Sequence, residues 1–303
     1  MTAAQPKVSV LMSVLDGEEY LAEAMDSILG QDFTDFEFVI VDNASTDRTA
    51  EIIASYGDHR IVTITNSETL NLSQSLNRGL VAARGDYVAR LDADDIALPG
   101  RLRKQAAWLD AHSDVALVAT AACEFNDDTP PPGRPYPTPP ADHDALMAAL
   151  STNSIIAHSS IMFRRQPVVE MGGYPETFTY CMDYLLYFRL ASKTRLAALP
   201  ETLVAIRSHP GQITALPSWR LRREVEAVAA FTEALNYPNL AVPVRAGLKR
   251  YRSQTSIRLA LIHARMAHPV AAAGWLCRAA FCAPLAFFHV VRNGLCNRLE
   301  HTQ

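Results

Sequence analysis

Apolar residues in the first third of the chain follow two alternating spacings. Short continuous apolar runs are typical of buried strands, and they predict strands at residues 8–14, 37–41, 61–65 and 87–91. Between these runs the apolar positions recur with a helical period, which predicts helices at residues 18–29, 45–56 and 73–83. Strands that alternate with helices in this way indicate βαβ units and a mostly parallel sheet, an α/β fold.

The pattern continues less regularly to about residue 217. It predicts helices at residues 99–112, 142–150 and 183–191, and strands at residues 115–125, 160–163 and 202–206. Residues 129–140 are rich in proline and fit neither spacing, which predicts an exposed polyproline-like loop. We favour a loop inserted near the mouth of an active site over a ligand for an SH3-type domain.

The C-terminal part has a different pattern and a different charge. We expect amphipathic helices at residues 219–235 and 244–267 and a more apolar, interrupted helix at 271–291. Residues 218–303 hold 12 Lys and Arg but only 4 Glu, a net charge of +8, whereas the first 217 residues carry −12. This asymmetry predicts two regions, residues 1–217 and residues 218–303.

Two interpretations of the basic helical region stay open. Basic and aromatic residues on amphipathic helices suit an anionic membrane surface. Alternatively, the helices form an extension that packs on the rest of the protein or on a second subunit. A helix that spans the membrane is not expected, because Arg278 would lie in the middle of the bilayer.

Composition narrows the class of protein. With 303 residues, 49% of them hydrophobic, the chain can form a large core. A net charge of −4 argues against general affinity for nucleic acid. The five cysteines are scattered, as in proteins with reduced cytoplasmic thiols, and no apolar signal core precedes the first predicted strand. We therefore expect a cytoplasmic protein, peripheral at the inner face of the cell membrane if the basic helices bind it.

Three carboxylates, Asp92, Asp94 and Asp95, follow the predicted strand at 87–91. The carboxyl ends of strands border the clefts of open α/β sheets. Carboxylate oxygens there suit Mg²⁺ or Mn²⁺, usually shared with the phosphates of a substrate. The alternative is that Asp94 or Asp95 caps the next helix. The chain has neither a GxGxxG nor a GxxxxGK[ST] sequence, so a Rossmann oxidoreductase and a P-loop NTPase are not supported.

Asp42 ends the second predicted strand. A carboxylate at this place can accept hydrogen bonds from a nucleobase or from ribose hydroxyls. Asp42 and Asn43 also have the chemistry of a turn, which is the structural alternative. Ser45 is the expected cap of the helix that follows.

Several ordered segments resemble the family 2 inverting glycosyltransferases of bacterial cell-surface glycan synthesis. They are residues 6–12, 41–47, 90–95, 172–174, 182–184 and 207–214. The resemblance implies a GT-A fold, a Rossmann-like, mostly parallel sheet flanked by helices. It also implies a nucleotide-binding half at about residues 6–112 and an acceptor half at about 113–217.

The resemblance further implies an activity. A hexosyl or N-acetylhexosaminyl group would pass from a nucleoside-diphosphate donor, with UDP the expected nucleotide, to a hydroxyl of a glycan or lipid-linked acceptor, with Mn²⁺ or Mg²⁺ as cofactor. The residues implied to bind the nucleotide sugar are Ser13, Leu15, Asp42, Arg90, Asp92 and Arg207. The implied metal ligands are Asp92, Asp94 and His209, and the implied acceptor side contains His158 and Ser159.

Asp183 matches the catalytic base of the family. Inversion at the anomeric carbon requires one carboxylate to take the proton of the attacking hydroxyl. A metal ion offsets the charge on the departing diphosphate, so a second carboxylic acid is not needed, unlike in glycoside hydrolases. Asp183 could also cap the predicted helix that begins beside it. Of the neighbouring carboxylates, Asp95 is expected to cap its helix, and Arg90 either approaches the phosphates or faces the edge of the core.

Three positions depart from the family pattern. Leu15 stands where an aromatic residue is usual, so stacking on the base is missing, and Met182 replaces the acidic residue that usually precedes the base. A neutral neighbour would not raise the pKa of Asp183 by repulsion. Asn71 replaces a glycine and can also adopt a left-handed conformation.

These departures keep a second hypothesis open, a catalytically inactive scaffold or regulator that binds sugar nucleotides. Leu15 and Met182 are the positions that favour it. A sugar nucleotidyltransferase is the third hypothesis. It is disfavoured because residues 15–19 are acidic, whereas such enzymes carry a glycine-rich basic loop after the first strand.

Overall fold

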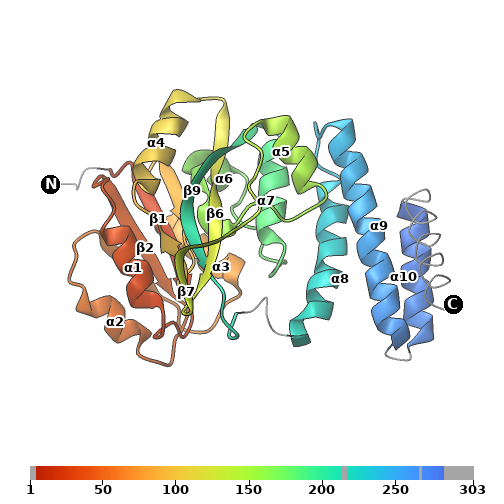
Figure 1. The fold of residues 1–303 in the computed structure, drawn as a ribbon, viewed down its shortest axis with the longest axis horizontal. Coiled ribbons are helices and arrows are strands. Elements are labelled where there is room, and N and C mark those ends of the chain that lie inside the picture. Colours follow the sequence, from red (N-terminus) through yellow and green to blue (C-terminus); the bar gives the residue numbers. More distant parts are fainter. Residues whose placement is uncertain (1–4, 213–216, 266–267, 283–303) are drawn as a thin grey trace. The chain divides into compact units, whose positions relative to one another are not determined.

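The computed structural model of the protein describes residues 5–212, 217–265 and 268–282. The chain divides into two compact units. The first contains residues up to 150 and residues 154–209, and the second contains residues 151–153 and those from 210 onward (Figure 1). The boundary predicted after residue 217 and the two halves predicted within the first region stay predictions.

A single sheet forms the centre of the first unit. Its strands are β1 (Val8–Val14), β2 (Phe36–Asp42), β3 (Ile61–Thr65), β4 (Tyr87–Arg90), β5 (Ile96–Ala97), β6 (Val115–Asn126), β7 (Thr129–Pro135), β8 (Met162–Arg164) and β9 (Arg195–Arg207). The order is β3-β2-β1-β4-β8-β6-β9-β5, and β7 pairs with β6. Strand β1 is parallel to β2 and β4, β2 to β3, and β6 to β9, whereas the other pairs are antiparallel.

Helices cover both faces of this sheet. They are α1 (Leu21–Leu29), α2 (Thr49–Ser55), α3 (Leu72–Ala82), α4 (Arg101–Ala111), α5 (His143–Leu150), α6 (Arg165–Glu170), α7 (Met182–Ala191) and the 3₁₀ helix η1 (His158–Ser160). Helices α1 and α4 pack in one hydrophobic cluster with Val10 and Met12 of β1. Helix α3 contacts β1 and β2 through Gly79, where a Cβ atom would lie 2.3 Å from Leu11 and 2.9 Å from Val41. The glycine therefore lets α3 approach the sheet closely.

The strand order reverses between β1 and β4. From β1 the chain moves outward through β2 to β3, and it then returns to β4 on the other side of β1. In open α/β sheets, ligands bind in the crevice at the carboxyl ends of the strands beside such a reversal. The carboxyl ends concerned are Val14 of β1, Asp42 of β2 and Arg90 of β4.

The predicted α/β fold is confirmed, and the alternating elements up to residue 91 lie within a few residues of their predicted places. The short elements β5 and α6 and the first half of β9 were not predicted. In β9 the sequence pattern is broken by Pro200, and the pairing with β6 is irregular around Leu199 and Thr202. The first half of β9 is therefore specified by its pairing with β6 rather than by the local pattern of apolar residues.

The prediction of an irregular loop over residues 129–140 is wrong for its first half. Residues 129–135 form β7, which pairs antiparallel with β6. Prolines are tolerated there because β7 pairs with β6 alone, and an edge strand has backbone N–H groups that no neighbour needs. Gly133, at φ 55°, lies against the Glu124 carbonyl, so the hairpin depends on a residue without a Cβ atom.

Three predicted helix ends are also corrected. Helix α2 begins at Thr49, whose N–H is bonded by Asp47 at 2.9 Å, so Ser45 is not its cap. Helix α4 is preceded by Gly100, so Asp95 is not a cap either. Asn71 has φ −69° rather than a left-handed conformation, and it caps α3 in a reciprocal arrangement with Gln74.

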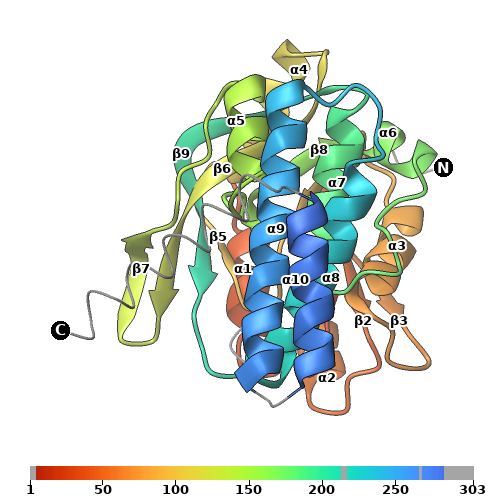
Figure 2. The same ribbon diagram turned by 90° about the vertical axis from the view of Figure 1, so that its right-hand side faces the viewer.

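The second unit contains α8 (Pro217–Ala234), α9 (Val242–Arg265) and α10 (Pro269–Cys282). Figure 2 shows these helices side by side, and α9 contacts both of the others. Arg258 of α9 forms an ion pair with Glu224 of α8 at 3.0 Å, and Arg245 donates to the Leu235 carbonyl at 2.6 Å. Some of the basic residues therefore join the helices to one another.

The predicted third helix of this unit ran to residue 291, and its part beyond residue 282 lies outside the described residues. Residues 266 and 267, at the predicted end of the second helix, also lie outside them. Among the helices that the structure describes, none is both long and apolar enough to cross a membrane.

Candidate active site

Asp92 follows β4 at the strand reversal and is held by two side chains. The fully buried Arg90 donates to its Oδ1, and the Ser159 hydroxyl lies 3.0 Å from its Oδ2. Although burial opposes ionisation, the Arg90 charge keeps the pKa of Asp92 below its ordinary value. Asp92 is thus a carboxylate whose charge is balanced from inside the protein. Of the two positions considered for Arg90, the structure shows the one in the core.

Asp94 lies beside His209, with 3.1 Å between Oδ2 and Nε2. Burial and the charge of Asp92 raise the pKa of Asp94. The His209 ring also lies 4.8 Å from the ring of Tyr20. A carboxylate oxygen and an imidazole nitrogen could together ligate a divalent cation such as Mn²⁺, and phosphate oxygens and water would supply the remaining ligands.

The three predicted metal ligands are therefore not equivalent. The structure brings Asp94 and His209 together, whereas Asp92 is occupied by Arg90 and Ser159. Within the described residues, no group of three or more His, Cys, Asp or Glu side chains is arranged to hold a metal ion. The residues present would fit a divalent cation that Asp94 and His209 ligate while a substrate supplies further oxygen ligands.

Asp95 connects the end of β4 with the end of β9. Its Oδ1 accepts the Arg207 backbone N–H at 2.9 Å, and its Oδ2 accepts the Ser159 hydroxyl. Burial, together with the charges of Asp92 and Asp94, raises the pKa of Asp95 well above its ordinary value. Ser159 is buried and bridges two of these carboxylates, so the structure places it within the carboxylate network rather than on a free acceptor surface.

Arg207 fixes the segment that carries His209. Its guanidinium pairs with Asp127 at 2.7 Å and with Glu23, and its Nε donates to the Asp94 carbonyl at 3.1 Å. The rings of Tyr20 and Phe125 lie 4.4 and 4.5 Å from the guanidinium. Its side chain is 5% exposed. The geometry thus shows Arg207 in contact with protein groups that neutralise it.

Asp183 lies in the first turn of α7, two residues after the N-cap position at Cys181. Its Oδ1 accepts the Tyr184 N–H at 2.8 Å. This hydrogen bond orients the carboxylate, although Asp183 is not the N-cap residue of the helix. Burial raises the pKa of Asp183 to about 6, and the charge of Asp92 adds to the rise. The residue that raises it by repulsion is therefore distant in the sequence, not the neutral Met182.

The charges of Arg90 and Asp92 act on His158 as they do on Asp183. Its Nε2 is 3.0 Å from the Tyr174 hydroxyl, and the two rings meet edge to face. Burial, reinforced by the charge of Arg90, lowers the pKa of His158 to about 3. His158 is consequently a neutral hydrogen-bonding group at physiological pH.

The other end of the site is formed by β1 and β2. Ser13 is half-buried, and its hydroxyl lies 2.7 Å from that of Ser75 on α3. Asp42 is 3% exposed, and its Oδ1 accepts the Ser45 N–H at 3.0 Å, as expected of a turn. Leu15 is 47% exposed. In register, Ser13 pairs with Val41, so Ser13 and Asp42 lie at the same edge of adjacent strands.

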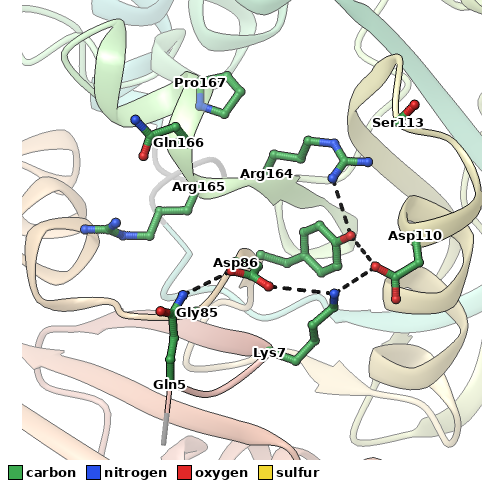
Figure 3. Close-up of a pocket in the computed structure, with 11 residues that line it drawn as sticks. Gln5, Lys7, Gly85, Asp86, Asp110, Ser113, Arg164, Arg165, Gln166 and Pro167 are labelled. Carbon is green, nitrogen blue, oxygen red and sulfur yellow. Dashed lines mark hydrogen bonds and ion pairs between the residues drawn. The ribbon is translucent and has the colours of Figure 1, made fainter.

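Cavities occur at both edges of the sheet. One of about 460 Å³ lies at the amino ends of β1 and β4, where Lys7 pairs with Asp110 at 2.8 Å and with Asp86 at 3.7 Å (Figure 3). We do not take this cavity as the active site, because ligands of open α/β sheets bind at the carboxyl ends of the strands, and this cavity lies at their amino ends. A cavity of about 300 Å³ lies beside α3 and contains Arg78 and Glu176.

Several residues around the site were missed. Glu23 and Asp127, which neutralise Arg207, and Asn66 and Ser75, which lie behind Ser13, belong to no recognised pattern. Glu23 is 184 positions from Arg207 along the chain, so only the fold brings them together. Asn43 stood in a recognised segment but was interpreted only as a turn residue.

Comparisons with known proteins identify the family of the chain. Residues 9–172 match the model of glycosyl transferase family 2. EpsE of Bacillus subtilis (strain 168), named as a glycosyltransferase, is 37% identical over 172 residues, 56% of this chain and 60% of that protein. The amylovoran biosynthesis glycosyltransferase AmsE of Erwinia amylovora is 28% identical over 224 residues, 72% of this chain and 83% of that protein.

Solved structures share the fold at lower identity. The S. aureus TarS 1-349 complex with UDP-GlcNAc has a TM-score of 0.66 at 20% identity, covering 83% of this chain and 72% of that one. The mannosyltransferase PcManGT of Pyrobaculum calidifontis, in complex with GDP-Man and Mn²⁺, has a TM-score of 0.64 at 20% identity, covering 98% of this chain and 81% of that one. The GT-A fold implied by the sequence is thereby confirmed, and the chain belongs to glycosyl transferase family 2.

Proposed function

We propose that the chain is a metal-dependent, inverting glycosyltransferase. It moves a hexosyl or N-acetylhexosaminyl group from a UDP-linked donor to a hydroxyl of a glycan or lipid-linked acceptor. The observation that carries the proposal is the pairing of Asp94 with His209 at the strand reversal. Asp183 adds to it, because burial and the charge of Asp92 raise the pKa of this carboxylate. Family membership and the names of relatives in polysaccharide biosynthesis support it.

The donor would lie along the carboxyl ends of β1, β2 and β4. Asp42 and Ser13 would contact the base, with Leu15 beside it, and Asp94 and His209 would hold the metal ion under the diphosphate. When bound, the cation offsets the charge that develops on the departing diphosphate. Asp92 would contact the ribose. We assign Arg90 and Arg207 to holding Asp92 and His209 in place, because protein carboxylates already neutralise them.

Asp183 would act as the base. The acceptor oxygen forms a bond to the anomeric carbon while the bond from that carbon to the diphosphate oxygen breaks. The proton of the acceptor hydroxyl passes to Asp183, and the electron pair of the broken bond stays with the diphosphate. A pKa of about 6 makes Asp183 a stronger base than an ordinary carboxylate while leaving it ionised at neutral pH. Neutral His158 would face the acceptor as a hydrogen-bonding group.

The choice of UDP is supported by the TarS complexes with UDP and UDP-GlcNAc, whereas PcManGT binds GDP-Man with Mn²⁺. We further propose that the protein works in the cytoplasm, with residues 218–303 as a separate region that binds the inner face of the membrane. Exposed Lys249 and Arg250 on α9 support that part of the proposal.

Thermal stability against a panel of nucleoside diphosphates, with and without Mn²⁺, tests the donor site. A ligand that binds only the folded state raises the melting temperature. At a ligand concentration one hundred times Kd, it adds about 2.7 kcal/mol to the free energy of unfolding. We expect a rise with UDP that requires Mn²⁺ and disappears in Asp94→Ala. The control Asp86→Ala removes a carboxylate at the opposite edge of the sheet and should respond like the wild type.

The outcomes separate the hypotheses. Undiminished transfer in both Asp94→Ala and Asp183→Ala would contradict the proposed mechanism. Binding of UDP without transfer to any of a broad set of acceptors would favour the inactive scaffold instead. No response to any nucleotide would mean that the fold has been kept without its donor site.

A further inference from the structure

Helix α3 holds the backbone of Tyr174 through the side chain of Asn77. Asn77 Oδ1 accepts the Tyr174 N–H at 2.8 Å, and Asn77 Nδ2 donates to the Tyr174 carbonyl at 2.9 Å. The same nitrogen donates to Glu176 Oε1 at 2.9 Å. Because a backbone N–H can only donate and a carboxylate can only accept, these bonds fix which end of the amide is oxygen. One side chain therefore sets the position of Tyr174 at both of its backbone polar groups.

Gly173 makes this close approach possible. Its φ angle is 75°, a left-handed conformation, and a Cβ atom there would lie 2.4 Å from Asn77 Oδ1. The turn directs the Tyr174 side chain into the interior, where it is 1% exposed. Burial raises the pKa of Tyr174, the Arg90 guanidinium opposes the rise, and the charge of Asp183 adds to it. The phenol thus keeps its hydrogen at neutral pH, and it lies within reach of the charge of the proposed base.

The hydroxyl of Tyr174 has a single hydrogen-bond partner within the part of the chain that the structure describes. That partner is His158, whose Nε2 lies 3.0 Å away. A buried hydroxyl hydrogen without an acceptor costs about 1–3 kcal/mol, so the phenol donates to Nε2. Nε2 must then be the ring nitrogen without a hydrogen. The neutral imidazole carries its hydrogen on the other nitrogen, Nδ1.

The Nδ1–H group of His158 is consequently free for a ligand. Among the described residues, no protein group forms a hydrogen bond with it. His158 is half-buried, whereas Tyr174 behind it is fully buried. The residue after His158 is Ser159, which bonds to Asp92 and Asp95 at the carboxyl end of β4. The half-buried imidazole therefore belongs to the same edge of the sheet as the candidate active site.

We propose that Tyr174 is a positioning residue that fixes His158 as the Nδ1–H tautomer, and that this N–H donates to an oxygen of a sugar acceptor beside Asp183. The inference rests on the proposed function. Asp183 would take the hydrogen of the attacking hydroxyl, whereas His158 needs a lone pair, so the two recognise different oxygens. The acceptor expected is a sugar with a second hydroxyl or a ring oxygen next to the reacting hydroxyl. Asn77 acts one step further back, because it holds Tyr174.

The tautomer is measured by NMR of the ring nitrogens in the full chain labelled with [¹⁵N]histidine. The spectrum is recorded at about pH 8, where an ordinary histidine is mostly neutral. His158→Gln identifies the His158 signals by their loss. His112 is an internal reference, because its Nδ1 lies 2.7 Å from the Trp108 carbonyl and must carry a hydrogen there. We expect His158 to show the pattern of His112 in the wild type.

Two tyrosine variants test the positioning role. Tyr174→Phe removes the bond that sets the tautomer, so the His158 signals should shift toward those of the Nε2–H form. Tyr56→Phe is the matched control, because the Tyr56 hydroxyl bonds to Asp26 and to the Ala22 carbonyl and takes no part in the site. It should leave the His158 signals unchanged. Asn77→Asp, which cannot donate to the Tyr174 carbonyl, should shift them in the same direction as Tyr174→Phe.

The contact with the acceptor is tested on the same signals. Methyl glycosides of hexoses and N-acetylhexosamines, added with UDP and Mg²⁺, should shift the Nδ1 signal of His158 and leave that of His112 in place. The absence of any shift over this panel would overturn the acceptor contact. An Nε2–H tautomer in the wild type would overturn the positioning role whether or not the variants fold, as would a Tyr174→Phe spectrum identical to that of the wild type.

Calorimetry with UDP and Mg²⁺ separates these failures from failure of the proposed function. A wild-type protein that binds UDP but shows the wrong tautomer leaves the proposed function standing. A wild-type protein that binds no nucleoside diphosphate would overturn the proposed function, and the inference about the acceptor with it.

Discussion

Burial of Asp183 has consequences for catalysis and for stability. Its pKa rises from 3.8 to about 6 in the folded protein. Since only the ionised form can accept a proton, kcat/KM should be constant above about pH 7 and fall tenfold per pH unit well below pH 6. A profile of kcat/KM against pH checks this. A limb that bends near pH 4 would show that Asp183 keeps an ordinary pKa or is not the base.

The same shift predicts how stability varies with pH. The folded state holds the Asp183 proton more tightly than the unfolded state does, so this group makes folding less favourable as the pH rises from about 4 to about 6. Asp183→Asn cannot ionise and should therefore be more stable than the wild type at pH 7, although inactive. Urea unfolding at pH 4 and pH 7 measures it. A stability difference between the two proteins that does not change between these pH values would contradict the prediction.

For single residues, the sequence predicts the chemical role of a side chain better than it predicts which groups surround that side chain in the fold. Asp94 and His209 could be assigned as partners from their segments, and the structure places them 3.1 Å apart. The occupation of Asp92 by a buried Arg90 could not be foreseen, because periodicity does not say whether a residue at a strand end faces the cleft or the core. The neutrality of His158 likewise depends on burial, which only the fold determines.

At the scale of elements, the close contact of α3 with the sheet can be tested through Gly79. A Cβ atom there would overlap Leu11 and Val41, so Gly79→Ala should cost about 1–3 kcal/mol of stability by overpacking. It should also weaken UDP binding, because α3 carries Ser75. Urea unfolding and calorimetry measure the two effects.

Gly274 provides a matched control for this substitution. It lies within α10, and a Cβ atom there would meet nothing within 4 Å. Gly274→Ala should therefore stabilise the protein slightly through helix propensity. A Gly79→Ala protein that is as stable as the wild type would show that the helix can move away from the sheet at little cost.

The predictability of elements follows the type of strand pairing. Strands β1 to β4 were predicted because parallel strands covered by helices are continuous apolar runs. Strand β7 was missed because its prolines oppose local strand formation, and only its pairing with β6 stabilises it. The two-residue strand β5 has too little sequence to show any period.

At the scale of the whole molecule, the proposed membrane contact predicts binding to anionic vesicles. Each Lys or Arg near an anionic surface contributes about 1 kcal/mol. The double variant Lys249→Glu, Arg250→Glu should therefore bind phosphatidylserine vesicles much less than the wild type in cosedimentation. Lys193→Glu, an exposed change in the first unit, is the control. A wild-type protein that stays in the supernatant would favour the alternative, helices that pack on protein.

The distance along the chain between Asp94 and His209 affects the order in which parts of the protein are synthesised and fold. These residues are 115 positions apart, whereas β1, β2, β3 and β4 follow one another directly. During synthesis, the strands that would surround the base leave the ribosome long before the histidine does. Closing the longer loop carries the larger entropic cost. Pulsed hydrogen exchange during refolding should therefore show protection of β1 and β2 amides before those of β9. An emerging chain would then hold the nucleotide end of its cleft before it could hold a cation.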